Sequence, residues 1–519
     1  LIIVILFMIL VYRLPGLGAG IALLVYTALM LVTLNAFDIT LTLPGIAGII
    51  LGIGMAVDAN VIIFARVKEE LTAGKSVHAS LKSGFQKAMS AIVDGNITTL
   101  IAAGVLWLRG SGTVKGFAQT LALGIVVSMF TALVITRLII FAFYGAGIHN
   151  EKVYGRHLKE RKPVDFLGKK KIFFVISIIL CLAGPVMMGV NHARGIGAMN
   201  YSLDFVGGTS TNVTFDKEYT LEEIDSQMIP SLEEITGDKN IQVQTVKDSN
   251  QVVFKTQTLD LEKREALASY LNENYGVEAS DIATENISST VSSEMRRDAV
   301  IAVIIATICM LLYIWFRFKD IRFATSAVVA LMHDVLVVLG FYVIARVSVG
   351  NTFIACMLTI VGYSINGTIV IFDRIREALA TKSRTEDLKD LVNRCITQTL
   401  TRTIYTNFTT FVMVVALYIL GVSSIKEFAA PLMVGIICGG YTSVCITGAL
   451  WYVMKTRLGE EAKAARAASG TKTVSVKAAD KKEGTTSTES NAADTSADDS
   501  SKKKKGKKTS FKNKKSKKR

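Results

Sequence analysis

The chain has 519 residues, half of them hydrophobic, and a formal net charge of +15. Its mean hydropathy is +0.42, and the apolar residues occur in long blocks instead of at amphipathic spacing. A segment needs about 20 mostly apolar residues to cross the hydrocarbon of a bilayer, and soluble cores use shorter runs. The composition therefore excludes a set of soluble domains and predicts a polytopic α-helical membrane protein.

About eleven segments are apolar enough to span a membrane. In chain order they are 1–12, 17–36, 43–64, 91–108, 117–144, 172–190, 299–316, 323–347, 352–372, 398–420 and 428–454. The chain opens on LIIVILFMIL with no basic residue ahead of it, unlike a signal peptide. We therefore expect a fragment that begins within a truncated first span.

Basic residues predict the orientation of these spans. The loop 145–171 holds eight Lys and Arg residues, and the segments 65–90 and 317–322 are basic as well. Because Lys and Arg accumulate in cytoplasmic loops, these segments are expected in the cytoplasm. The stretch 191–297, with nine basic and eighteen acidic residues, then lies outside. The expected location is the bacterial cytoplasmic (inner) membrane, with a cytoplasmic C-terminus.

The chain ends in a segment of low complexity, 457–519, whose last nineteen residues hold twelve Lys and Arg. Such a composition cannot bury enough apolar surface to fold, so disorder is expected. A lysine run of this kind attracts anionic lipid weakly. No specific nucleic-acid partner is expected.

An internal repeat relates the two halves of the chain. MAVDANVIIFARVKEEL (55–71) aligns with YSINGTIVIFDRIREAL (363–379) at an offset of 308, and NITTL (96–100) aligns with NFTTF (407–411) at 311. Parallel repeats form pseudo-symmetric halves with function at their interface. We expect two related bundles, with the first span and external domain of the first half lying upstream of residue 1.

The stretch 191–297 has the pattern of a soluble domain. The predicted elements are a strand at 212–215, a helix at 220–235, strands at 241–246 and 251–256 around a KDSN turn, a helix at 261–276 and a strand at 280–288. The order β-α-β-β-α-β indicates an α+β ferredoxin-like domain. It contains no His/Cys cluster, phosphate loop or nucleophile constellation. We expect no cofactor, no metal and no catalytic site.

Several ionisable residues lie inside predicted spans, where they are costly and usually functional. Asp58 lies well inside its span, and Asp94 and Arg402 lie near the cytoplasmic ends of equivalent spans. The repeat places Asn366 opposite Asp58. We predict an ion relay of Asp58, Arg402, Asp94 and Asn366. Supporting roles are assigned to His333, Asp334, Thr409 and Thr410, although packing or hydrogen bonding also explains these four.

The motifs around these residues resemble a known family. LPGIAGIILGIGMAVDANVIIFARVKEEL (43–71) and DGNITTLIAAGVLWLRGSGTVKGFAQTLALGIVVSMFTA (94–132) resemble the membrane half of SecD. LDFVGGT (203–209), WFRFKDIRFATSAVVALMHDV (315–335), LTIVGYSIN (358–366), IVIFDRIRE (369–377) and QTLTRTIYTNFTTF (398–411) resemble SecF. Over roughly residues 1–456 the chain is thus similar to the fused SecDF arrangement of the SecD/SecF protein-export family, relatives of the RND transporters.

The resemblance implies an auxiliary, non-enzymatic subunit of the Sec translocase. Such a subunit uses the proton or sodium motive force to promote late translocation and release of secreted polypeptides. The implied partners are the SecYEG translocon, YajC and YidC-type proteins, and the translocating preprotein. The family's relay aspartate and arginine fall on Asp58 and Arg402, but Gly367 stands where the family has a second aspartate.

The expected organisation divides the chain into six parts. They are a SecD-like bundle of five spans (1–147), a basic cytoplasmic linker (148–171), a first SecF-like span (172–190), the external domain (191–297), a SecF-like bundle of five spans (298–456) and the tail (457–519). An RND-type exporter of lipids or small hydrophobic compounds is an alternative, since its bundle looks similar. An intramembrane aspartyl protease is disfavoured because Gly367 leaves no second catalytic aspartate.

Overall fold

The computed structural model describes residues 1–39, 41–110, 112–155, 162–238, 241–245, 250–383, 385–421 and 423–457. The predicted lysine-rich tail after 457, part of the predicted linker and most of the KDSN turn lie outside the described residues. Ten described helices are long and apolar enough to cross a membrane, and a shorter apolar helix, Ile2–Tyr12, precedes them. The prediction of a polytopic helical protein with about eleven spans is confirmed.

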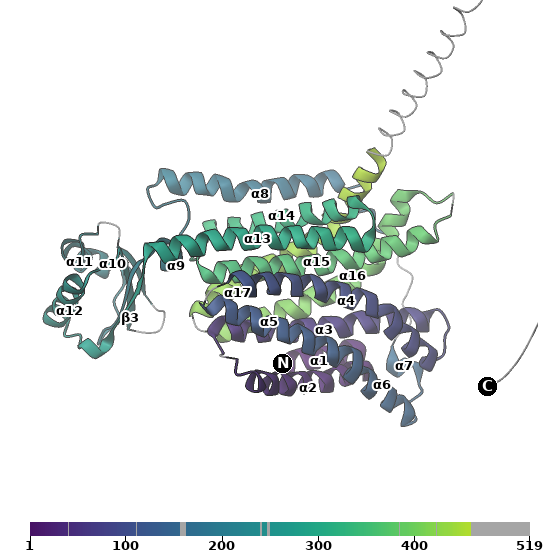
Figure 1. Cartoon of the computed structure of the whole chain (residues 1–519). Coiled ribbons are helices and arrows are strands. Elements are labelled where there is room, and N and C mark those ends of the chain that lie inside the picture. Colours follow the sequence, from purple (N-terminus) through teal and green to yellow (C-terminus); the bar gives the residue numbers. More distant parts are fainter. Residues whose placement is uncertain are drawn as a thin grey trace, which may run out of the picture. The chain divides into compact units, whose positions relative to one another are not determined.

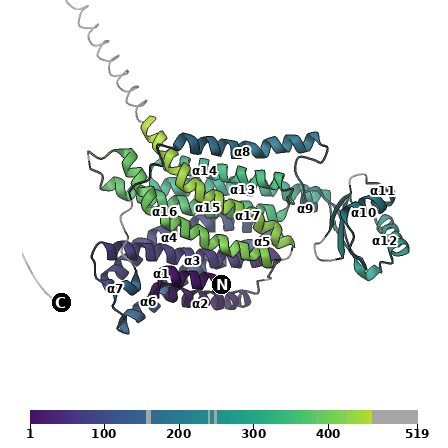
Figure 2. The ribbon, with the colours of Figure 1, turned by 180° about the vertical axis from the view of Figure 1, so that it is seen from behind.

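The first half consists of α1 (Ile2–Tyr12), α2 (Leu14–Ala36), α3 (Leu43–Thr72), α4 (Val77–Arg109), α5 (Gly112–Phe130), α6 (Thr136–Gly145) and the short α7 (Glu151–Tyr154). The second half consists of α8 (Lys170–Ala193), α13 (Ser289–Phe318), α14 (Ile321–Ile344), α15 (Asn351–Ala380), α16 (Leu388–Leu420) and α17 (Ser423–Thr442), and the last span continues to Arg457. Figures 1 and 2 show α8 along one edge of the bundle and α1 with α2 at the opposite edge.

The helix boundaries reproduce the repeat residue for residue. Both ends of α3 and α15 are related by 308, and both ends of α4 and α16 by 311. The last span of each half is also interrupted by a five-residue π-helical turn, Thr131–Ile135 in the first half and Ser443–Thr447 in the second. A π turn inside an α-helix is rare. Its occurrence at equivalent positions shows that the repeat extends beyond the matching motifs.

The two central helices are α3 and α15. In the most apolar window of each, 83% and 89% of the residues are buried, against 11% for α8. Small residues permit this packing: a Cβ on Gly54 would lie 3.4 Å from Thr410, and one on the equivalent Gly362 would lie 3.1 Å from Thr99. Close helix approach through small residues is how membrane helices associate. The interface between the halves is therefore the interior of the bundle.

The soluble pattern forms a four-stranded antiparallel sheet. Its strands are β1 (Gly208–Thr214), β2 (Gln242–Thr245), β3 (Gln251–Thr256) and β4 (Ile282–Ile287), in the order β2-β3-β1-β4. The helices α10 (Leu221–Gln227), α11 (Ile229–Thr236) and α12 (Leu261–Tyr275) lie between strands in sequence. This order and pairing agree with the predicted ferredoxin-like domain.

The prediction of a single helix at 220–235 is wrong, because this segment forms two helices. Thr220 begins the first with a capping box to Glu223, as a Thr N-cap should. The chain then bends at Met228, and Pro230 occupies the first turn of α11. A proline lacks the N–H that a continuous helix needs, so a new helix begins there.

The segment before β1 attaches to the second bundle. Tyr201 forms an isolated parallel bridge with Val349, and the amide of Ser202 donates to the Val349 carbonyl at 3.0 Å. In α9 (Leu203–Val206), Asp204 accepts a hydrogen bond at 3.2 Å from the first amide of α15, that of Asn351. The start of the central helix α15 is thus tied directly to the chain that leads into the sheet.

Candidate functional site

The candidate site lies where α3, α15 and α16 meet. Asp58, on α3, is 1% exposed. The hydroxyl of Thr409, on α16, lies 3.5 Å from its Oδ1, and its Oδ2 has no hydrogen-bond partner in the described part of the chain. The Thr409 hydroxyl has one proton and is closer to the carbonyls of Tyr405 and Thr406, at 3.0 and 2.9 Å. Asp58 is therefore a buried carboxyl group with almost no protein hydrogen bonding.

Arg402, on α16, supplies the nearby positive charge. It acts electrostatically on Asp58, yet its Nη2 has no hydrogen-bond partner within the described ranges. Removing an ion from water without pairing it costs several kcal/mol. Asp58 Oδ2 and Arg402 Nη2 are thus two buried polar atoms without protein partners in the described part of the chain, and they mark this place as the candidate site.

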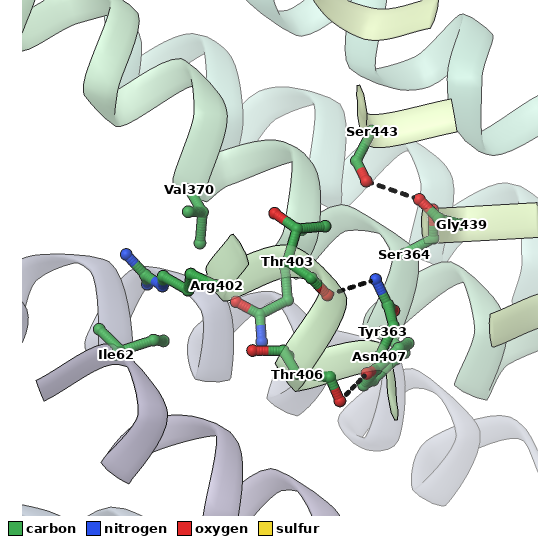
Figure 3. A pocket seen from close by; sticks show the side chains of 12 residues that line it. Ile62, Tyr363, Ser364, Val370, Arg402, Thr403, Thr406, Asn407, Gly439 and Ser443 are labelled. Atoms are coloured by element: carbon green, nitrogen blue, oxygen red, sulfur yellow. Dashed lines mark hydrogen bonds between the residues drawn. The ribbon is translucent and has the colours of Figure 1, made fainter. Parts of the chain in front are cut away.

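A small cavity lies beside Arg402 (Figure 3). Its volume of about 20 Å³ is enough for a single water. Ile62, one turn after Asp58, lines it together with Asn366, Arg402, Thr403, Asn407 and Ser443. Figure 3 shows Arg402 and Ile62 at one side of this cavity and Ser443 with Gly439 at the other. Polar side chains of α15, α16 and the turn after α17 thus line this cavity together with apolar ones such as Ile62 and Val370.

Asn366 lies on α15 where the repeat predicts the counterpart of Asp58. Its Oδ1 is a buried oxygen without a partner among the described residues. It packs against the backbone of Gly95, where an added Cβ would fall 2.2 Å from Oδ1. The next residue, Gly367, also lines the cavity. The structure therefore brings Asn366 and Arg402 to one cavity, with Asp58 close to it.

Asp94 forms its hydrogen bonds with residues of α13. Arg317, from α13, donates through Nε to both carboxylate oxygens at 2.8 Å, and Tyr313 donates to Oδ1 at 2.9 Å. Asp94 does not line the cavity beside Arg402. No partner of Asp94 was predicted, because Arg317 belongs to a basic turn that was interpreted as a cytoplasmic loop. A relay role for Asp94 stays a prediction.

His333 and Asp334 form a second buried polar group on α14. Asp334 is fully buried, and its Oδ1 lies within hydrogen-bond distance of His333 Nδ1, at 3.1 Å. It accepts from the Cys438 thiol at 3.1 Å and from the Thr442 hydroxyl at 2.9 Å. The Ser364 hydroxyl, on α15, also donates to it. Thr409 borders Asp58 as described above, and Thr410 packs against Gly54 with its hydroxyl lacking a partner in the described residues.

The charged residues that end the matching motifs 55–71 and 363–379 form an ionic cluster. Arg66 pairs with Glu69 at 2.9 Å and reaches across to Glu377 at 3.5 Å. The equivalent Arg374 pairs with Glu377 at 3.0 Å and reaches across to Glu69 at 4.0 Å. The contacts are reciprocal, so the same motif forms both sides of the connection between halves.

The fold and these groups define a class: polytopic membrane proteins of two pseudo-symmetric, RND-type bundles with ionisable groups buried between them. The model "Protein export membrane protein SecD/SecF, C-terminal" matches residues 1–145 and 267–457. The chain belongs to this SecD/SecF family.

Relatives from several bacteria agree with this assignment. The chain is 37% identical to the protein translocase subunit SecDF of Bacillus subtilis over 88% of this chain and 63% of the relative. It is 38% identical to that of Brucella abortus over 86% of this chain and 58% of the relative. The chain thus spans less than two thirds of the length of these relatives.

The two halves also match separate proteins and a solved structure. A SecD of Acidaminococcus fermentans is 52% identical over 32% of this chain, and a SecF of Calditerrivibrio nitroreducens is 36% identical over 58% of it. The crystal structure of SecDF from Thermus thermophilus, titled a translocon-associated membrane protein, superposes with a TM-score of 0.78 at 35% identity, covering 88% of this chain and 61% of that one. The fused SecDF arrangement predicted from the motifs is confirmed.

Proposed function

We propose that the protein is an auxiliary subunit of the Sec protein-export translocase and that an ion gradient across the cytoplasmic membrane drives it. The observation that carries this proposal is that Asp58, which is buried, and the half-buried Arg402 each have a buried polar atom, Oδ2 and Nη2, without a partner among the described residues. A proton that binds Asp58 removes its charge and changes its attraction to Arg402. Because α3 and α16 belong to different halves, this change acts on their relative position.

The sheet domain is the proposed output of this movement. The chain ahead of β1 is bound to the start of α15 through Asp204 and Asn351. A shift of the central helix would thus be transmitted to the domain predicted to lie outside the membrane. There it would help the emerging polypeptide leave the translocon, late in translocation. The proposed partners are SecYEG with YajC and YidC-type proteins, and the preprotein itself.

Export stimulation in proteoliposomes tests this function. Vesicles containing SecYEG, with and without the protein, receive an imposed proton gradient or, separately, a sodium gradient. The protein is expected to accelerate completion of preprotein translocation under one of these gradients, and an ionophore for that ion should remove the effect. Stimulation that persists without any gradient would contradict the proposal. Gradient-driven efflux of a hydrophobic dye without an effect on export would support the exporter alternative instead.

A further inference from the structure

The buried carboxylate of Asp334 has no role in the pair Asp58–Arg402. It lies on α14 and is fully buried, with hydrogen-bond donors on α14, α15 and α17. Its only described ion-pair partner is the neighbouring His333. A buried carboxylate without a fixed cation is costly unless it holds a proton or its partner does. Asp334 and His333 therefore have the chemistry of a group that shares one proton.

The groups that face Asp334 permit it to change charge. The Thr442 hydroxyl lies 2.9 Å from Oδ2 and 3.1 Å from the carbonyl of Cys438, so it has an acceptor in either state. The other titratable groups around it are the thiols of Cys438, on α17, and Cys181, on α8. Tyr441, on α17, has its ring 6.3 Å from that of His333.

Asp334 is connected to the cavity of the candidate site. Ser364 donates its hydroxyl proton to Asp334 and also lines the cavity that Arg402 borders. The path from Asp334 to Arg402 thus consists of one hydroxyl group and a cavity with room for one water. Asp334 lies at one end of this path and Arg402 at the other, and Asp58 lies one helical turn before Ile62, which lines the cavity.

The first half of the chain has no carboxylate at the position equivalent to Asp334. The offset of 308 that relates the last residues of α2 and α14 places Tyr26 opposite Asp334. On the central helix α15 itself, Asn366 and Gly367 occupy the positions that face the cavity. The second half therefore carries its carboxylate on the flanking helix, whereas the first half carries Asp58 on the central one.

We propose that Asp334, paired with His333, is a second proton-holding site and exchanges protons with the Asp58–Arg402 pair through Ser364 and the cavity. In this step the Asp334 carboxyl gives its proton to Ser364 Oγ, while the proton already on Ser364 passes to water in the cavity. The reverse transfer restores both groups. The inference rests on the proposed function, because it needs gradient-driven proton movement.

Proton flux in proteoliposomes tests the inference. Asp334→Asn retains the acceptor oxygen and removes the exchangeable proton, so the initial rate of gradient-driven flux is expected to fall at least about tenfold. Asp334→Glu is expected to recover part of it. His333→Gln is expected to lower the flux as well, because it removes the group 3.1 Å from Asp334 that shares the proton. A thermal unfolding midpoint close to that of the unsubstituted protein shows that each variant is folded.

The controls separate this inference from the proposed function. If Asp58→Asn leaves flux unchanged, the proposed function fails. If Asp58→Asn abolishes flux but folded Asp334→Asn and His333→Gln both retain it, only this inference fails. The exposed Asp225→Asn, on α10, is the matched control for loss of a carboxylate and should behave as the unsubstituted protein.

Placing a carboxylate on α15 provides a positive test. A Cβ on Gly367 would lie 3.2 Å from Ser443 Oγ, so a side chain fits if Ser443 yields slightly. In the Asp334→Asn background, Gly367→Asp is expected to restore flux, and adding Ser443→Ala gives the new side chain more room. A folded double or triple variant without flux would contradict the proposal. Stoichiometric zinc that Cys438→Ala removes would also overturn it, because a metal-bound carboxylate holds no proton.

Discussion

The central helices α3 and α15 are equal in length and nearly equal in burial, yet they differ in what they carry at the middle of the bundle. α3 carries Asp58, whereas α15 carries Asn366 and Gly367 at the equivalent depth. The packing contacts repeat: Gly54 with Thr410, and Gly362 with Thr99. The repeat thus preserves backbone geometry and close approach, while the polar groups have diverged.

The largest expected effect comes from removing the positive charge between the halves. Arg402→Met should reduce gradient-driven flux by more than about tenfold, since it removes the positive charge that lines the cavity, and ionisable groups at membrane depth are usually functional. Arg402→Lys should retain part of the flux, because it keeps the charge without the guanidinium geometry. The exposed Arg194→Met is the control. Flux equal to that of the unsubstituted protein in Arg402→Met would show that the cation is not needed.

The contact between Gly95 and Asn366 offers a test of packing between the halves. Gly95→Val should destabilise the protein by about 1–3 kcal/mol, because its side chain would overlap that of Asn366. Gly104 lies on the same helix with no atom within 4 Å of an added Cβ, so Gly104→Val is the matched control. Thermal unfolding in detergent gives the comparison. Equal midpoints for the two variants would mean that the interface is looser than described.

A smaller effect is expected at the ionic cluster. Arg66 has a side chain only 8% exposed and contacts acids from both halves, whereas the Glu377 side chain is 47% exposed. Glu377→Gln should cost less than about 1 kcal/mol, as exposed ion pairs do. Arg66→Gln should cost more, because it leaves Glu69 and Glu377 without that partner. A double-mutant cycle on the thermal midpoints measures the coupling, and a larger cost for Glu377→Gln would contradict the geometry.

The smallest effect concerns the segment that joins the halves. Asp165 accepts from the amide of Gly168 at 2.8 Å, from Asn393 at 2.9 Å and from Lys389 at 3.2 Å. These hydrogen bonds, that from the Gly168 amide most of all, hold the pKa of the Asp165 carboxyl below its ordinary value of 3.8. A lowered pKa means that this contribution is present above pH 3.8 and is lost as the pH falls through the folded-state pKa.

Hydrogen exchange at the Gly168 amide measures this contact. Its protection should decline below pH 3.8 in the unsubstituted protein, after correction for the intrinsic exchange rate. Protection should be low at all pH values in Asp165→Ala, which removes the acceptor. The Thr220 amide, which donates to Glu223, serves as an internal reference on the sheet domain. Protection of the Gly168 amide that survives in Asp165→Ala would show that the other contacts of this segment with α16 cause it, and not Asp165.

The sequence was sufficient for the bundle because length, hydropathy and the repeat are local signals. The pattern 55–71 against 363–379 predicted two equivalent central helices, and the matching ends of α3 and α15 agree. The break at Met228 was missed although Pro230, in the interior of the single helix predicted at 220–235, was the signal for it.

The partners of the buried polar groups could not be predicted in the same way. Asp94 meets Arg317 across more than two hundred residues, and Asp334 meets Ser364, Cys438 and Thr442 from two other helices. Such contacts depend on helix rotation and tilt, which the packing of neighbouring helices sets. The sequence could identify ionisable residues at membrane depth, but only the structure shows which of them share a cavity.

Proton flux through Asp58→Asn is the most direct test of the central claim. Asparagine is close in size to aspartate but cannot bind and release a proton at neutral pH. In vesicles with an imposed gradient, the initial rate should fall at least about tenfold, toward that of protein-free vesicles, with Asp58→Glu retaining part of the rate. Folded Asp58→Asn that conducts at the rate of the unsubstituted protein would contradict the account.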